Sequence, residues 1–106
     1  MDKEKELVEI LANNFGLTVH ISELDTESDY LKKIQILLSE RIQFLISTDV
    51  EKLFQILYKV DVPQGQTDLA FDLGDIKKVS MKIAELIIVR QLKKIDYSRK
   101  FYGEKK

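Results

Sequence analysis

Hydrophobic positions recur at helical spacing along most of the chain, and the longest such stretch lies near its carboxyl end. Residues 75–102 contain no Gly or Pro and precede Gly103, a residue type that often caps a helix C-terminus. Projected at 100° per residue, their apolar side chains cover roughly 240° of the circumference, far more than the ~100° stripe of a surface helix. We therefore predict one long helix that must be covered from two sides.

Two helices are predicted in the first half of the chain. Apolar residues at helical spacing, with acidic residues in the first turn, predict a helix over 2–14. A longer amphipathic pattern predicts a second helix that ends near residue 46. Two pairs of residues resemble its N-terminal cap: Ser22 with Asp25, and Thr26 with Asp29.

A third helix is predicted immediately after a break at Ser47. Thr48 and Glu51 have the spacing of a capping box and stand directly before an apolar run, so this helix should cover about 49–59. Pro63 ends it, because proline has no backbone N–H and disfavours helical geometry in the residue before it. The break between the second and third helices predicts a sharp turn.

Two connecting segments are predicted to lack regular structure. Residues 17–21 alternate apolar and polar side chains, which favours an extended connector with His20 facing solvent. Residues 62–74 are predicted to form a loop that is held against the helices by its large apolar side chains. Those side chains are Leu69, Phe71 and Leu73.

Composition is consistent with one small domain. The chain has 106 residues, of which 44% are hydrophobic and 33% charged, as in an ordinary globular protein. We expect a single helical domain over 1–106, with 1–16 and 103–106 peripheral or frayed. The charged start does not resemble a signal peptide, no apolar run approaches the ~18 residues of a membrane span, and the absence of cysteine favours the cytoplasm.

These elements predict an all-α fold in which a small bundle of three to four helices packs on the long C-terminal helix. Because that helix has surplus apolar surface, we expect a non-enzymatic interaction or structural module, and a homodimer or a complex with another protein. The expected contact lies on the side of the C-terminal helix that the other helices should leave open. Its residues are Ile88, Val89, Leu92, Ile95 and Tyr102.

The distribution of charge supports a second hypothesis. Residues 90–106 carry seven Lys or Arg against two acidic residues, a net +5, so the total of −1 leaves −6 for residues 1–89. A basic and aromatic tail of this kind, Arg90–Lys106, could bind nucleic acid or another polyanion. The expected contacts are Lys93, Lys94, Arg99 and Lys100. Cations also gather at helix C-termini because the macrodipole favours them there, and the acidic remainder opposes a polyanion.

Arg90 differs from the other cations because it projects within the apolar arc of the predicted helix. A buried unpaired charge would be costly, so we expect a buried ion pair with a carboxylate. The candidate partners are Glu40, Asp49 and Asp61.

No residue pattern indicates catalysis or a cofactor. His20 is the sole histidine and no Cys is present, so no nucleophile motif can be assembled. The aspartates at 61, 68, 72 and 75 could supply oxygen ligands, but their spacing does not match a calcium loop, and turns and caps commonly use aspartate. The four glycines are isolated, so no phosphate loop is present. We expect no enzyme, no metal, no cofactor and no small-molecule substrate.

Overall fold

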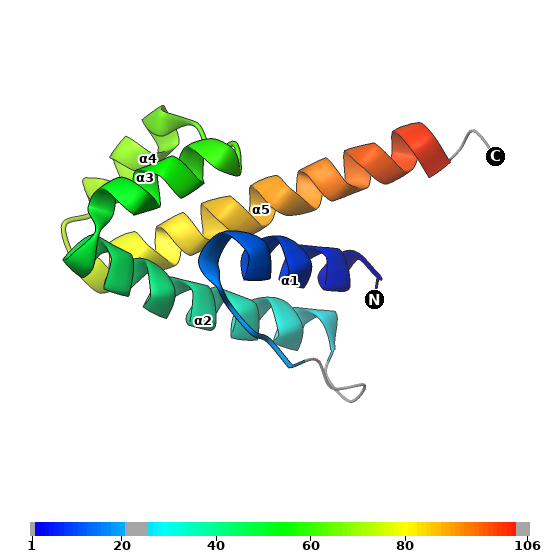
Figure 1. Cartoon of the computed structure of the whole chain (residues 1–106), viewed down its shortest axis with the longest axis horizontal. Helices are drawn as coiled ribbons and strands as arrows, with labels where there is room; N and C mark the ends of the chain where they lie inside the picture. The colour runs from blue at the N-terminus through cyan, green and yellow to red at the C-terminus, as the bar shows by residue number, and fades with distance from the viewer. Residues whose placement is uncertain (1, 21–25, 104–106) are drawn as a thin grey trace.

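The computed structural model describes residues 2–20 and 26–103, and these residues form helices without any strand (Figure 1). The all-α fold with a long C-terminal helix is therefore confirmed. The five helices of this part of the chain are α1 (Asp2–Phe15), α2 (Glu27–Thr48), α3 (Val50–Lys59), α4 (Gln64–Phe71) and α5 (Ile76–Gly103).

Helix α5 is the axis of the molecule, with α1 and α2 on one side and α3 and α4 on the other, over its N-terminal half (Figure 1). The contact between α2 and α5 is the most extensive of those between helices. The last turns of α5 extend beyond the other helices in Figure 1. The long helix is thus covered from two sides, as its apolar circumference requires, and both coverings come from the same chain.

The hydrophobic core draws residues from all five helices. Fully or almost fully buried examples are Leu7 and Leu11 in α1, Ile34, Leu38 and Ile42 in α2, Leu53 and Leu57 in α3, Ala70 in α4, and Ile83 and Ile87 in α5. Helix α1 therefore contributes side chains to the core, so the expectation that 1–16 is peripheral is wrong for this helix. Of the expected frayed end, 104–106 lie outside the described residues.

The start of α2 is fixed by a reciprocal cap. The backbone N–H of Asp29 donates to the Thr26 hydroxyl (3.1 Å), and the backbone N–H of Thr26 donates to the Asp29 carboxylate (3.3 Å). Hydrogen bonds that the Asp29 carboxylate accepts from the Thr26 side chain and from the Thr26 backbone N–H lower the pKa of Asp29, because they favour its charged form. Of the two predicted arrangements, the structure contains the one at Thr26, whereas the pair at Ser22 lies outside the described residues.

The junction between α2 and α3 falls where the sequence predicts it, but another residue makes the cap. Asp49 accepts from the backbone N–H of Lys52 at 3.1 Å, whereas the Thr48 hydroxyl donates to the carbonyl of Phe44 at 2.7 Å. Helix α2 continues through Thr48, so its hydroxyl returns to the preceding turn and is not placed to cap α3. The predicted capping box of Thr48 with Glu51 is therefore wrong.

The segment predicted as a loop over 62–74 contains helix α4. Pro63 precedes its first residue, where the missing N–H and fixed φ of proline are well tolerated. The buried residues of α4 are Thr67 and Ala70, while Leu69 and Leu73 are 70% and 50% exposed. The prediction that Leu69 and Leu73 hold this segment to the bundle is therefore wrong, whereas Phe71 is partly buried and packs against the core as predicted.

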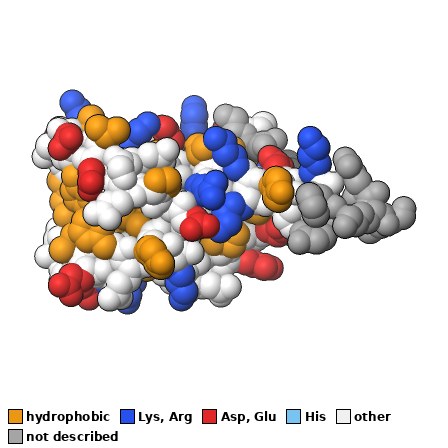
Figure 2. Space-filling model, turned by 90° about the horizontal axis from the view of Figure 1, so that it is seen from above, with side chains coloured by type: hydrophobic (Ala, Val, Ile, Leu, Met, Phe, Trp, Pro, Cys, Tyr) orange, Lys and Arg blue, Asp and Glu red, His pale blue; other side chains and the backbone are white. Residues whose placement is uncertain are grey.

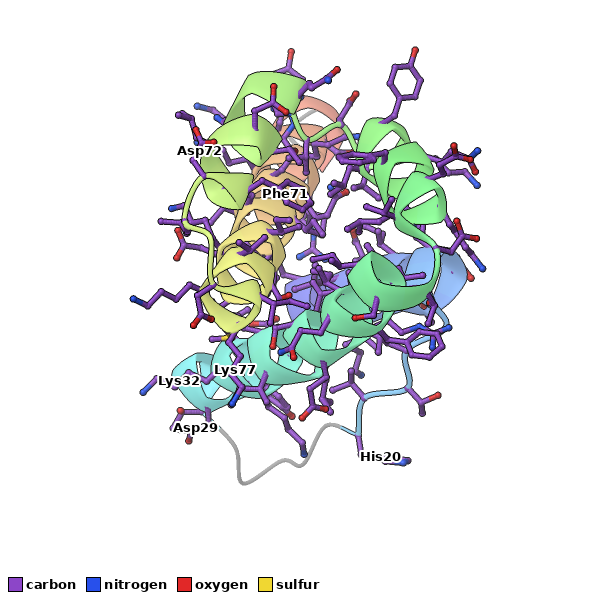
Figure 3. All side chains as sticks on the ribbon, turned by 90° about the vertical axis from the view of Figure 1, so that its left-hand side faces the viewer. His20, Asp29, Lys32, Phe71, Asp72 and Lys77 are labelled. Atoms are coloured by element: carbon purple, nitrogen blue, oxygen red, sulfur yellow. The ribbon has the colours of Figure 1, made fainter. Side chains whose placement is uncertain are left out.

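The connector after α1 matches the prediction over its described part. Gly16 ends α1 with a positive φ of 69°, a conformation that glycine adopts without steric cost. Residues 16–20 then lack regular structure; Val19 is buried, and His20 is exposed and points away from the bundle in Figure 3.

Candidate functional surfaces

The predicted dimer seam on α5 is largely covered within the chain. Ile88 and Ile95 are only 6% and 4% exposed, and Leu92 is half-buried. Helix α1 packs along this part of α5 and makes two ion pairs with it, Lys3 to Asp96 and Arg99 to Glu6, both at 2.8 Å.

The seam prediction is therefore wrong for Ile88 and Ile95, because the chain's own helices already bury both side chains. Val89 is 45% exposed and remains at the surface. Tyr102 lies in α5, but its side chain is outside the described part of the structure.

The clearest exposed apolar surface lies over α3, α4 and the turn that follows. Figure 2 shows hydrophobic side chains gathered on this end of the molecule. The large apolar side chains that are exposed here are Phe54 (42%), Tyr58 (86%), Leu69 (70%) and Leu73 (50%). We call this surface the α3–α4 face. Exposed apolar side chains that gather in this way are typical of protein interaction sites.

A groove of about 150 Å³ opens on the α3–α4 face. It is lined by Phe54, Leu57, Tyr58, Val62, Gln64 and Thr67, so no charged side chain lines it. Phe54 also contacts Phe71 with ring centroids 5.7 Å apart, and Figure 3 shows Phe71 pointing toward the space between α4 and α3. A cavity of about 150 Å³ can hold a benzene-sized group, so the groove matches one large apolar side chain.

The basic residues of α5 do not form one continuous surface. Arg90, Lys93, Lys94 and Tyr97 line a second, open hollow of about 410 Å³. Arg99 instead pairs with Glu6 of α1. Lys100 is exposed in the last turn of α5, and residues 104–106 lie outside the described chain. Of the four predicted polyanion contacts, the structure brings Lys93 and Lys94 together and directs Arg99 elsewhere.

Arg90 has one of the predicted partners, but the pair is not buried. Its guanidinium Nη2 lies 3.9 Å from Asp61 Oδ2, and its side chain is 45% exposed. Lys94 Nζ lies closer to the same oxygen, at 3.3 Å. The prediction of a buried ion pair is therefore wrong, because Arg90 reaches the rim of the helix interface and keeps its charge in water.

Gln91 is a buried polar residue that the sequence prediction omitted. Its side chain is 3% exposed and its Nε2 donates to the carbonyl of Val60 at 2.6 Å. On a helical projection Gln91 lies between Ile87 and Ile95, in the middle of the apolar arc. This position in the sequence could have identified Gln91 as a buried polar residue. The hydrogen bond attaches the turn after α3 to α5.

No three His, Cys, Asp or Glu side chains of the described residues are grouped so that they could hold a metal ion. None of the helices in the described chain is long and apolar enough to cross a membrane.

No protein-family model, curated protein or solved structure matches this chain. The functional argument therefore rests on the geometry of the groove on the α3–α4 face and of the hollow along α5.

Proposed function

We propose that the protein is a non-enzymatic helical interaction module that forms a homodimer through its α3–α4 face. The observation that carries the proposal is the uncharged groove between α3 and α4 beside two protruding apolar side chains, Tyr58 and Leu69. In a two-fold contact the same patch serves both subunits, so an apolar side chain of each copy can enter the groove of the other. The groove volume is suited to one such side chain.

The exposure of the α3–α4 face supports this contact over one centred on α5. Tyr58 is 86% exposed and Leu69 is 70% exposed, whereas Ile88 and Ile95 of α5 are already buried by the chain itself. Burying apolar area is the main driving force of stable association, at about 25 cal/mol per Å² removed from water. Because Ile88 and Ile95 are already buried in the monomer, they have almost no apolar area left to bury on association.

The test is the mass in solution, measured by light scattering over a series of protein concentrations. We expect the mass to rise from 12.4 kDa toward twice that value, with little dependence on salt because the contact is apolar. Leu69→Asp should keep the mass at that of the monomer, since it places a charge where an apolar contact is expected. The helical circular dichroism should be unchanged because Leu69 is exposed in the monomer.

Val89→Asp is the matched control. Val89 is 45% exposed on α5 and belongs to the seam that the sequence predicts. We expect this variant to dimerise like the unchanged protein. Loss of the dimer in Val89→Asp but not in Leu69→Asp would assign the contact to α5, and a wild-type chain that stays monomeric throughout would refute self-association.

A further inference from the structure

The hollow on α5 is built by a regular helical spacing. Arg90, Lys93, Lys94 and Tyr97 stand at positions i, i+3, i+4 and i+7, which share one face of a helix, and they span about 10 Å along its axis. Figure 2 shows a group of Lys and Arg side chains near the middle of this side of the molecule. Three cations and an exposed ring therefore face the same open space.

A carboxylate of the chain already occupies part of this cationic surface. Asp61 Oδ2 lies 3.3 Å from Lys94 Nζ and 3.9 Å from Arg90 Nη2. Lys93 makes no ion pair with an acidic side chain of the described residues, and the Tyr97 side chain is 67% exposed. The Asp61 carboxylate shows where an acidic group can sit between Arg90 and Lys94.

The position of Asp61 is fixed by the end of α3. The backbone N–H of Asp61 donates to the carbonyl of Tyr58 (3.2 Å), and that of Val62 donates to the carbonyl of Leu57 (3.0 Å), which is the Schellman pattern. Asp61 stands where this motif usually has glycine, and its φ is 65°. The buried hydrogen bond from the Gln91 side chain to the carbonyl of Val60 holds the same turn against α5.

An aspartate at this place is unfavourable for the backbone. The left-handed region is costly for residues with a Cβ, although Asp and Asn tolerate it better than most, and glycine would adopt it freely. The exposed ion pairs of Asp61 contribute little to stability. A strained residue whose side chain ends in a cationic hollow points to a role of that side chain in the hollow.

We propose that the hollow along Arg90, Lys93, Lys94 and Tyr97 binds an acidic peptide segment of another protein, and that Asp61 is an internal competitor for it. A glutamate or aspartate of the peptide takes the place of the Asp61 carboxylate, since a guanidinium and an ammonium group both bind carboxylates. A second acidic side chain of the peptide forms an ion pair with Lys93. A neighbouring apolar side chain of the peptide packs on the exposed ring of Tyr97.

The charge distribution favours a short acidic peptide over nucleic acid. A protein that binds nucleic acid tightly commonly makes about 6–10 phosphate contacts. The hollow presents three cations, two of which pair with Asp61. Arg99 is engaged by Glu6 of α1. The net charge of −6 over residues 1–89 also opposes the binding of a long polyanion.

The experiment titrates the intact protein into a fluorescein-labelled, glutamate-rich peptide with a single phenylalanine and follows fluorescence anisotropy. We expect saturable binding at low salt that weakens at roughly 0.15 M ionic strength. The double variant Lys93→Gln/Lys94→Gln should bind roughly two- to fivefold more weakly for each lysine removed. Asp61→Asn should bind more tightly, by about the same factor, because the competitor has lost its charge.

Matched controls separate a site from general electrostatics. Lys77→Gln/Lys78→Gln removes two exposed lysines from the other end of α5, and Asp72→Asn removes an exposed aspartate from the end of α4. We expect neither control to change peptide affinity appreciably.

Three results would overturn the proposal. Equal losses in the two lysine double variants would mean that the peptide senses only net charge. Unchanged affinity in Asp61→Asn would show that Asp61 does not compete. Tight binding of a fluorescein-labelled oligothymidylate with no binding of the peptide would assign the hollow to nucleic acid. Peptide affinity and solution mass are measured separately, so a protein that stays monomeric would refute the proposed dimer without refuting the peptide site.

Discussion

The hydrogen bond from Gln91 to the carbonyl of Val60 should be a major stabilising contact between α5 and the turn after α3. Both residues are almost completely buried, at 3% and 2% exposure, and the bond is 2.6 Å long. We choose Gln91→Met as the perturbation. Methionine has a similar length and helix propensity but cannot donate a hydrogen bond. The substitution therefore removes the donor while keeping most of the packing.

The expected loss follows from what remains after the substitution. The Val60 carbonyl would be buried without its side-chain donor, and a buried polar group left unsatisfied costs about 1–3 kcal/mol. With a urea m value of about 1–3 kcal/mol per M, a loss near the middle of that range moves the unfolding midpoint by roughly 1 M. The thermal midpoint should fall by several degrees, because each kcal/mol corresponds to about 4–8 °C in a domain of this size.

The assay is urea unfolding followed by circular dichroism, at one protein concentration for all variants because dimer formation would add to the apparent stability. Gln55→Met is the control, since Gln55 lies exposed on α3. It should change the free energy of unfolding by no more than about 0.5 kcal/mol. If Gln91→Met were as stable as this control, the Val60 carbonyl would have another partner, and the argument that Gln91 fixes the Asp61 turn would fail.

Three further substitutions test individual contacts. Ser80→Ala should raise the free energy of unfolding by about 1 kcal/mol in the same urea assay. The reason is that the buried Ser80 hydroxyl has no hydrogen-bond partner among the described residues. A lower free energy of unfolding in this variant would show that the hydroxyl does have a partner. Asp61→Gly should be more stable than Asp61→Ala by about 1 kcal/mol, since both lose the carboxylate and only glycine relieves the positive φ; equal stabilities would show that the turn carries no strain. The backbone N–H groups of Lys78 and Lys77 donate to the Asp75 carboxylate at the start of α5 and lower the pKa of Asp75. These hydrogen bonds therefore stabilise the folded state above the pKa that Asp75 has in the unfolded chain. Their contribution is lost as the pH falls through the lower pKa of the folded state. The thermal midpoint of Asp75→Ala should therefore lie below that of the unchanged protein near neutral pH, and the gap should narrow below about pH 4; a gap independent of pH would contradict this account.

Local signals in the sequence were sufficient for most of the helices. Periodicity and the absence of helix breakers located α1, α2, α3 and α5, because each buries a stripe of apolar side chains that recurs every three or four residues. The exception is α4, whose buried residues are Thr67 and Ala70 and whose leucine faces outward. A short helix that packs through small side chains carries no strong apolar period.

The surfaces depended on tertiary structure to a much greater degree. The sequence determined by itself that α5 needs two coverings and that the i, i+3, i+4, i+7 spacing from Arg90 to Tyr97 puts these side chains on one helix face, since both follow from helix geometry alone. Only the packing of the other helices against α5 buried Ile88 and Ile95. Only the turn after α3 brought Asp61 to Arg90 and Lys94, which are about thirty positions away in the chain. Helical periodicity describes one element at a time, whereas the groove and the hollow are formed where elements distant in sequence meet.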